Sequence, residues 1–265
     1  AAKPAYSRIL LKLSGEALCQ PGAAAGQSLD ATAIKTIAAN VRAAVDLGVE
    51  VALVVGGGNL FRGIAGSKRG IVRTTGDYIG MLATVMNGLA LRDGLQKAGL
   101  PCVVQSAFGI DGVAAAFDSS KAVRRLEANE VVLFVGGTGH PFFTTDTTAA
   151  LRACEVQADA LLKATKVDGV YSADPRQHAS AVRFETLTYT DALQQRLAVM
   201  DSTAFSLCMD NNLPIVVFNF SEPNALLRVL QGDTSLATVV GADASRPVQA
   251  DQSESVRAAT KKKGV

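Results

Sequence analysis

The sequence predicts an α/β protein with a largely parallel sheet, and three observations lead to this prediction. Short apolar runs alternate with longer segments of helical spacing, which is the order of βαβ units. Hydrophobic residues make up 48% of the chain but aromatic residues only 5%, so the core must consist mainly of Ala, Val, Leu and Ile, as in parallel strands buried beneath helices. Charged residues make up 19%, which is too few for a disordered chain.

Six short apolar runs are the predicted strands. In chain order they are Ile9–Leu13, Val49–Val55, Cys102–Ala107, Val131–Val135, Ala160–Leu162 and Ile215–Phe218. If these strands are parallel, their carboxyl ends meet at one edge of the sheet, and a ligand is expected there.

Four longer segments between these runs are the predicted helices: Asp30–Leu47, Asp77–Ala98, Ser119–Glu127 and Thr145–Cys154. The first can be capped by Asp30 and ended by Gly48, and Gly99 closes the second. Asp201 opens a further helix. The second helix carries apolar residues at helical spacing, as expected of a face buried in the core or in a subunit contact. They are Met81, Leu82, Val85, Met86 and Leu89.

We expect one domain over residues 1–241 and a disordered tail over residues 242–265, because no Pro-, Gly- or Ser-rich linker divides the chain. Without the tail the chain carries 21 basic and 21 acidic residues, so nothing indicates a nucleic-acid surface. Four widely spaced cysteines without a C-x-x-C motif argue against a disulfide framework or a zinc site. No apolar run has the length of a membrane span or the character of a signal peptide, and we expect a cytoplasmic protein.

Glycine-bearing turns follow three of the predicted strands. They lie in the segments Leu10–Glu16, Val54–Gly63 and Phe134–Asp146. None matches the P-loop or the dinucleotide-binding motif. Glycines let a ligand approach the backbone, and the Thr-Thr-Asp that opens the helix at Thr145 leaves amide donors free. The three turns are either ordinary turns or, as we predict, one anion-binding site.

Two charged residues accompany these turns. Lys12 interrupts an apolar strand just before Ser14 and Gly15, and a buried lysine is costly without an opposite charge. It either reaches solvent from an edge strand or places its ammonium over phosphate oxygens at the Gly15 turn. Asp146 is either a helix-start carboxylate favoured by the helix dipole or a group that holds a lysine or helps to site magnesium.

The segment Leu161–Pro175 has turn signals at Asp168 and Asp174 and can be read as a plain loop. It also offers an aromatic ring, Tyr171, beside the carboxylate of Asp174, which a ribose and a base would need. The two histidines, His140 and His178, have no nucleophile in a triad arrangement.

Three motifs in this order resemble the bacterial uridylate kinases, a family of the amino acid kinase superfamily. They are K-L-S-G-E at residues 12–16, G-G-G-N-L-F-R-G at 56–63 and G-T-G-x-P-F-F-T-T-D at 137–146. The resemblance extends over Ala5–Val240. It implies a three-layer αβα sandwich with a mainly parallel central sheet, a homohexamer, and magnesium-dependent transfer of the ATP γ-phosphoryl group to UMP, a step of pyrimidine nucleotide biosynthesis.

The resemblance also implies roles for individual residues. Lys12 would stabilise the transferring phosphoryl group, Asp146 would orient it, and Asp201 would support catalysis. The implied ATP-binding residues are Lys12, Leu13, Ser14, Gly15, Gly58, Arg62, Thr165, Tyr171 and Asp174. The implied UMP-binding residues are Gly57, Asp77, Thr138, Gly139, His140, Pro141, Phe142, Phe143, Thr144 and Thr145. Mg²⁺ would arrive on the ATP phosphates rather than in a dedicated protein site. GTP would act as an activator and UTP as an inhibitor.

Two departures from these relatives stand out. His140 occupies a position where they most often have Asn, and the loop Gln20–Leu29, in a region that the family uses for activation by GTP, is Ala-rich and long. Two other functions remain open from the residues alone. One is a kinase of a carboxylate or carbamate, and the other is a nucleotide-binding storage or regulatory protein on the same fold.

Overall fold

The computed structural model describes residues 3–20, 29–61, 70–175, 177–178, 180–197 and 200–242. The expected tail, from residue 243 on, lies outside these ranges, as do Arg62 and most of the loop Gln20–Leu29. Among the helices within the ranges, none combines the length and the apolar character that a membrane span requires.

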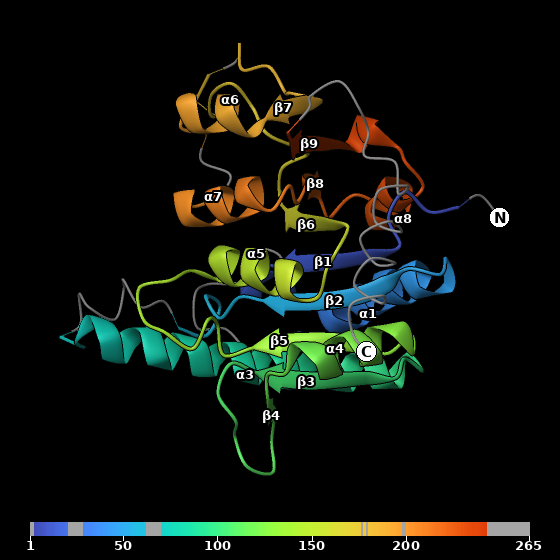
Figure 1. Ribbon diagram of the computed structural model, residues 1–265, viewed down its shortest axis with the longest axis vertical. Helices are drawn as coiled ribbons and strands as arrows, with labels where there is room; N and C mark the ends of the chain where they lie inside the picture. The colour runs from blue at the N-terminus through green and yellow to red at the C-terminus, as the bar shows by residue number, and fades with distance from the viewer. Residues whose placement is uncertain are drawn as a thin grey trace, which may run out of the picture.

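The described strands form one sheet. They are β1 (Arg8–Leu13), β2 (Glu50–Val55), β3 (Cys102–Ser106), β4 (Ala115–Ala116), β5 (Val131–Val135), β6 (Ala160–Thr165), β7 (Thr186–Thr188), β8 (Ile215–Asn219) and β9 (Ala237–Gly241). Their order across the sheet is β4-β3-β5-β2-β1-β6-β8-β9-β7 (Figure 1). All neighbours are parallel except β8 and β9. All six predicted strands are confirmed, and the largely parallel sheet with them.

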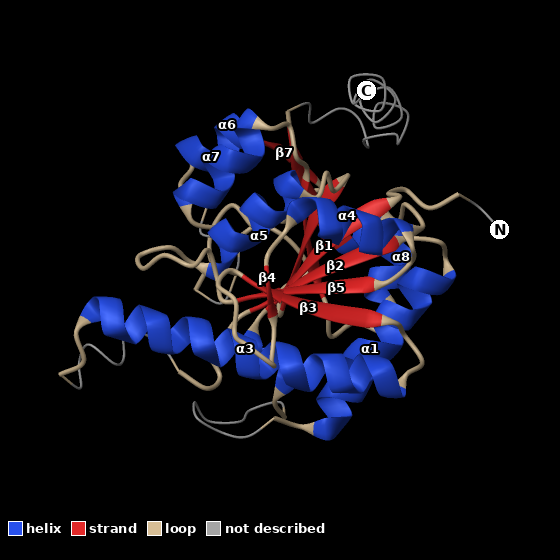
Figure 2. Cartoon of the chain, turned by 60° about the horizontal axis from the view of Figure 1, so that its bottom comes forward, coloured by secondary structure: helices blue, strands red, loops and turns tan. Residues whose placement is uncertain are grey.

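Helices cover both faces of this sheet (Figure 2). One layer contains α1 (Ala31–Asp46), α3 (Arg73–Lys97) and α8 (Ala225–Leu230), whose apolar residues share one core cluster. The opposite layer contains α4 (Ser119–Glu127), α5 (Thr145–Glu155), α6 (Tyr189–Gln194) and α7 (Ser202–Asp210), which share the other. The three-layer αβα sandwich is therefore confirmed.

Strand β1 shows how the alternation of side chains divides the core. Ile9, Leu11 and Leu13 belong to the cluster beneath α1, α3 and α8, whereas Leu10 belongs to the cluster beneath α5 and α7. Because alternate residues of a strand face the same side of a sheet, Lys12 shares the face of Leu10. The only charged residue of β1 beyond Arg8 is thus directed toward the layer that contains α5.

Helix α3 begins at Arg73, four residues before the predicted start at Asp77, and an ion pair between these two residues supports the extra turn. Its apolar stripe divides into two sets. Met81 and Val85 are buried, whereas Leu82 and Met86 are exposed, so the stripe serves the core on one side and leaves an apolar surface on the other.

Candidate active site

The three glycine turns meet at one edge of the sheet. Strands β5, β2 and β1 are neighbours and parallel, so the segments that follow them lie side by side. Together with α3 they line an open cavity of about 370 Å³. Many of the predicted site residues line it: Lys12, Ser14, Gly15, Gly57, Gly58, Asp77, Thr138, His140, Phe143, Thr144 and Thr145.

Two lysines from neighbouring strands bind one carboxylate beside this cavity. Lys12 of β1 is in register with Lys163 of β6. The Nζ atom of Lys12 lies 2.8 Å from Oδ1 of Asp146, and Nζ of Lys163 lies 2.5 Å from Oδ2. All three side chains are largely buried, with 12–15% of their surface exposed. Because β1 lies in the middle of the sheet, the alternative of an edge-strand lysine is wrong.

Burial and the neighbouring charges shift the pKa values of Asp146 and Lys163. Burial acts to raise the pKa of the Asp146 carboxyl, but the ammonium groups of Lys12 and Lys163 outweigh burial, and the pKa lies below its ordinary value. Burial lowers the pKa of Lys163, although the Asp146 carboxylate opposes that shift. The Asp201 carboxylate also acts on Lys163 and opposes the lowering of its pKa, so two carboxylates face the two lysines.

Asp201 connects the starts of two helices. Thr144 caps α5, because its Oγ1 accepts hydrogen bonds from the amides of Asp146 (3.1 Å) and Thr147 (3.2 Å). The Asp201 carboxylate accepts hydrogen bonds from the hydroxyls of Thr144 and Thr147 and, at 2.8 Å, from the amide of Ala204. Asp201 therefore caps α7 and fixes the helix start that carries Asp146, without lying among the described residues that line the cavity.

Asp77 holds the loop that follows β5. Its Oδ2 accepts a hydrogen bond of 2.8 Å from the amide of Phe142, and Nε of Arg73 lies 2.9 Å from both of its oxygens. The Arg73 guanidinium also lies 5.4 Å from the centroid of the Phe142 ring. Phe142 has a φ of 73°, which is uncommon for a bulky residue and needs such support.

Three predicted residues of this loop, Gly139, Pro141 and Phe142, do not line the cavity. Gly139 has a φ of 83° and packs against Ala107. Phe142 is 65% exposed, whereas Thr138 lines the cavity and accepts a hydrogen bond of 3.2 Å from the amide of His140. The loop thus presents only some of its side chains to the cavity.

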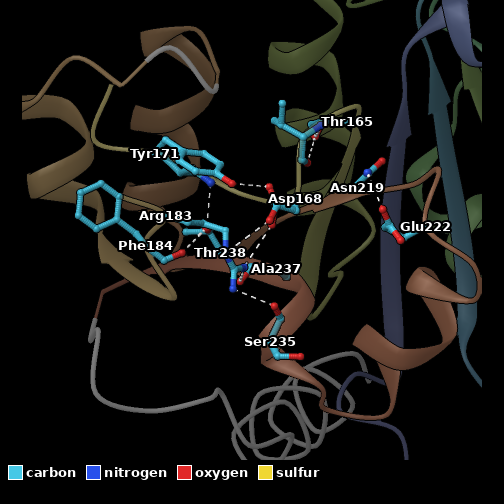
Figure 3. A network of polar contacts seen from close by, with 12 residues as sticks. Thr165, Asp168, Tyr171, Arg183, Phe184, Asn219, Glu222, Ser235, Ala237 and Thr238 are labelled. Atoms are coloured by element: carbon cyan, nitrogen blue, oxygen red, sulfur yellow. Dashed lines mark hydrogen bonds and ion pairs between the residues drawn. The ribbon is translucent and has the colours of Figure 1, made fainter. Parts of the chain in front are cut away.

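Three further predicted residues, Thr165, Tyr171 and Asp174, lie at or after the carboxyl end of β6 and do not line the cavity. Figure 3 shows Thr165 and Tyr171 with their neighbours. Thr165 ends β6, and its hydroxyl accepts a hydrogen bond of 3.1 Å from the Val167 amide. The Tyr171 hydroxyl donates to Asp168 at 2.7 Å. Asp174 is exposed, and its Oδ2 accepts from Gln177 at 3.2 Å. Because β6 is next to β1, this segment lies on the same edge of the sheet as the cavity.

Arg183 connects this segment to the start of β9 and the turn before it. Its guanidinium donates hydrogen bonds to the carbonyls of Ala237 (3.0 Å), Ser235 (2.8 Å) and Asp168 (3.2 Å), as Figure 3 shows.

The predicted residue Leu13, at the end of β1, has a fully buried side chain, so Leu13 can offer a ligand only its backbone.

Sequence reasoning missed one residue of the charged cluster, Lys163. The interrupted apolar run around Lys12 has a counterpart in A-L-L-K-A-T, where Lys163 interrupts an apolar strand in the same way. That signal was available, but pairing it with Lys12 required the register of β1 and β6, which are 147 residues or more apart in the chain.

Comparisons with known proteins agree on one family. The family model described as "Amino acid kinase family" matches residues 7–219. Relatives named "Uridylate kinase" from Pectobacterium atrosepticum and Pseudomonas aeruginosa are 53% and 52% identical over 232 residues, which is 88% of this chain and 95% and 94% of theirs.

Solved structures give the same result. A UMP kinase from Bacillus anthracis has a TM-score of 0.86 at 39% identity, covering 90% of this chain and 97% of that one. A UMP kinase from Ureaplasma parvum has a TM-score of 0.82 at 36% identity, covering 88% and 98%.

Proposed function

The chain belongs to the amino acid kinase family, and we propose that it is a UMP kinase, which transfers the γ-phosphoryl group of ATP to UMP and yields UDP and ADP. The observation that carries this proposal is the position of Lys12. Its ammonium is fixed by Asp146 at the wall of a cavity formed by three glycine turns. Phosphoryl transfer asks for in-line positioning and charge neutralisation more than for covalent chemistry, and this arrangement provides both.

At the reaction centre, Lys12 stabilises the negative charge on the transferring phosphoryl oxygens. Asp146 orients Lys12 and Lys163 by binding one ammonium with each carboxylate oxygen. Asp201 supports the centre indirectly, because it fixes the first turn of α5 through Thr144 and Thr147. The proton balance is simple, since the acceptor is a phosphate oxygen of UMP and no general base is needed.

The acceptor nucleotide occupies the cavity between α3 and the loop after β5. Gly57 lets the UMP phosphate approach the backbone, and Asp77 contacts the ribose. The loop from Thr138 to Thr145, with His140, Pro141, Phe142 and Phe143, surrounds the base and sugar. This assignment is supported by the cavity lining, which contains Gly57, Asp77 and five of the eight residues of that loop.

The donor nucleotide approaches from the β1 and β6 side. Its phosphates lie against Leu13, Ser14, Gly15 and Gly58, and Arg62 neutralises phosphate charge. Thr165, Tyr171 and Asp174 hold the ribose and base. In support, the glycines line the cavity and the β6 segment ends at the same edge of the sheet.

Magnesium is the expected companion of ATP. Among the described residues no group of three or more His, Cys, Asp and Glu side chains could hold a metal ion, and both oxygens of Asp146 are paired with lysines. This donor set fits an ion that the ATP phosphates carry, so we place Mg²⁺ there. When bound, it would neutralise negative charge that develops on the phosphate oxygens during transfer.

The proposed assembly is a homohexamer, with GTP as an activator and UTP as an inhibitor. The exposed apolar side chains of α3, namely Tyr78 (48%), Leu82 (49%) and Met86 (58%), recur every four residues and so form one face suited to a subunit contact. The loop Gln20–Leu29, which the resemblance connects with GTP, lies mostly outside the described residues. We propose that the protein is cytoplasmic, because its substrates ATP and UMP are found there.

A coupled assay that measures ADP formation tests the proposed function. The purified protein is given ATP and Mg²⁺ with UMP, CMP or acetylglutamate in parallel. Of the three acceptors, we expect only UMP to give rapid ADP formation. Comparable turnover of CMP would contradict the assignment to uridylate, turnover of acetylglutamate would indicate a carboxylate kinase, and binding without turnover would indicate a regulatory protein.

A further inference from the structure

Two asparagine side chains are buried beneath the glycine turns and bind each other. Asn59, in the turn after β2, is 3% exposed, and Asn87, in the middle of α3, is fully buried. The Asn87 amide nitrogen donates to Asn59 Oδ1 at 2.7 Å, and the Asn59 nitrogen donates to Asn87 Oδ1 at 3.2 Å. Burying two amides is costly unless they are hydrogen-bonded, so this reciprocal pair holds α3 and the turn in one arrangement.

The pair also contacts the backbone of both phosphate-side turns. The Asn87 nitrogen donates its second hydrogen to the Gly56 carbonyl at 2.6 Å, and the Gly56 amide in turn donates to the Leu13 carbonyl at 3.0 Å. A Cβ atom at Gly15 would lie 2.3 Å from Asn59 Oδ1 and 2.5 Å from the Gly56 carbonyl oxygen. The turn after β1 therefore rests directly on the asparagine pair and on the turn after β2.

A third contact reaches the far end of the first turn. The Asn59 nitrogen lies 3.5 Å from Sγ of Cys19, which follows the short 3-10 helix that begins at Gly15. Asn59 thus meets this element at its start and at its end. Neither asparagine is among the described residues that line the cavity, so neither is placed to touch a nucleotide.

We infer that Asn87 is a positioning residue for phosphoryl transfer, which acts through Gly56 and Asn59 to fix the turn after β1 relative to the turn after β2. The inference rests on the proposed function, in which the first turn receives the donor phosphates and Gly57 the acceptor phosphate. In-line transfer needs both phosphates in register, and a misplacement of about 1 Å costs on the order of 100-fold in rate.

A purely structural role predicts a different result from a positioning role. Truncating Asn87 removes three hydrogen bonds of a buried pair, so either role lowers stability. Only the positioning role lowers turnover in molecules that remain folded, because each turn still binds its own nucleotide while the distance between the two phosphates changes. The informative quantity is therefore kcat compared with the two KM values.

The experiment measures kcat and KM for ATP and for UMP in Asn87→Ala, at a temperature at which circular dichroism shows the variant fully folded. We expect kcat to fall by about 10- to 100-fold and both KM values to stay within about threefold. Leu95→Ala is the matched control: Leu95 is fully buried two turns farther along α3 and its truncation also destabilises the core, but kcat should stay near the wild-type value.

Asn59→Ala and the double variant complete the test. If the two amides act as a unit, the double variant loses little more turnover than Asn87→Ala does. Asn87→Ser and Asn59→Ala report on the same contacts should Asn87→Ala not fold. An unchanged kcat, or a kcat that falls equally in Leu95→Ala, overturns the inference. A wild-type protein that does not phosphorylate UMP overturns the proposed function and this inference with it, whereas an active wild type with unaffected variants overturns the inference alone.

Discussion

Lys12 and Lys163 lie in register on neighbouring parallel strands and bind opposite oxygens of the Asp146 carboxylate, at 2.8 and 2.5 Å. The sheet brings two like charges together, and the first turn of α5 supplies the one negative charge between them. Lys12 lines the cavity, whereas Lys163 is not among the described residues that line it. The cluster is therefore asymmetric: one ammonium lies at the cavity wall, and the other binds the carboxylate away from it.

Asp146→Asn should destabilise the fold, because it leaves two buried ammonium groups without their counter-charge. We expect a loss of about 3–5 kcal/mol in the free energy of unfolding at pH 7, measured by urea denaturation. Asp93→Asn is a matched control, since Asp93 forms an exposed ion pair with Lys97 whose loss should cost less than about 1 kcal/mol. Equal stability of Asp146→Asn and the wild type would contradict the buried cluster.

The same carboxylate should make stability depend on acidic pH. Its pKa in the folded state lies below the ordinary value of 3.8, so its contribution is fully present above pH 3.8 and is lost as the pH falls through the lower folded-state pKa. Wild-type protein should lose this contribution in that window, and Asp146→Asn should not. Parallel pH profiles of the unfolding free energy for the two proteins would show that another carboxyl group causes the effect.

Asp201→Ala should affect the UMP side more than the ATP side. The change removes the cap of α7 and the carboxylate that holds Thr144 and Thr147, so we expect a stability loss of about 1–3 kcal/mol and a higher KM for UMP. Asp118→Ala removes an N-cap of the same kind from α4, another nine-residue helix, and should leave both KM values unchanged. A KM for UMP that stays at the wild-type value would refute the role of Asp201 in placing Thr144.

Asp174→Asn should weaken the binding of ATP and leave the binding of UMP nearly unchanged. The exposed carboxylate of Asp174 belongs to the segment after β6, on the proposed donor side, so its loss should remove the proposed ribose or base contact without disturbing the core. Titration of each nucleotide by calorimetry measures the two affinities separately. The reverse pattern would mean that the two nucleotide sites are exchanged.

Leu82→Glu should weaken the proposed assembly, because it places a charge in the centre of the exposed apolar face of α3. We expect sedimentation analysis to show smaller species than the wild type forms. Val182→Glu is the control, since Val182 is 66% exposed and shortly precedes β7, which lies at the opposite edge of the sheet from the strands that α3 contacts. A variant that sediments like the wild-type protein would remove this face from the subunit contact.

Much of the sheet could be predicted from the sequence because its central strands are buried on both faces and read as continuous apolar runs. The peripheral strands could not. Thr186–Thr188 has only three residues, too few for a recognisable pattern. Ala237–Gly241 pairs antiparallel to β8, and the direction of pairing cannot be predicted from a five-residue segment. In the site, the glycine turns and Lys12 were visible because each breaks a local pattern.

Contacts between distant segments were beyond sequence reasoning. Lys163 interrupts its strand as Lys12 does, but only the pairing of β1 with β6 makes it a partner of Asp146. Asn59 and Asn87 look like ordinary polar residues, one in a turn and one in a helix, and only packing shows that they are buried and bonded to each other. Each case needs tertiary register, which no local spacing contains.

The turnover of Lys12→Ala, measured with saturating ATP, Mg²⁺ and UMP, tests the central claim that a fixed ammonium stabilises the transferring phosphoryl group. Removing one preorganised charge partner of a transition state costs on the order of 10²–10³ in kcat, about 3–4 kcal/mol, and this is the result we expect from a variant that is folded by circular dichroism. A folded Lys12→Ala protein with a kcat near the wild-type value would contradict the account.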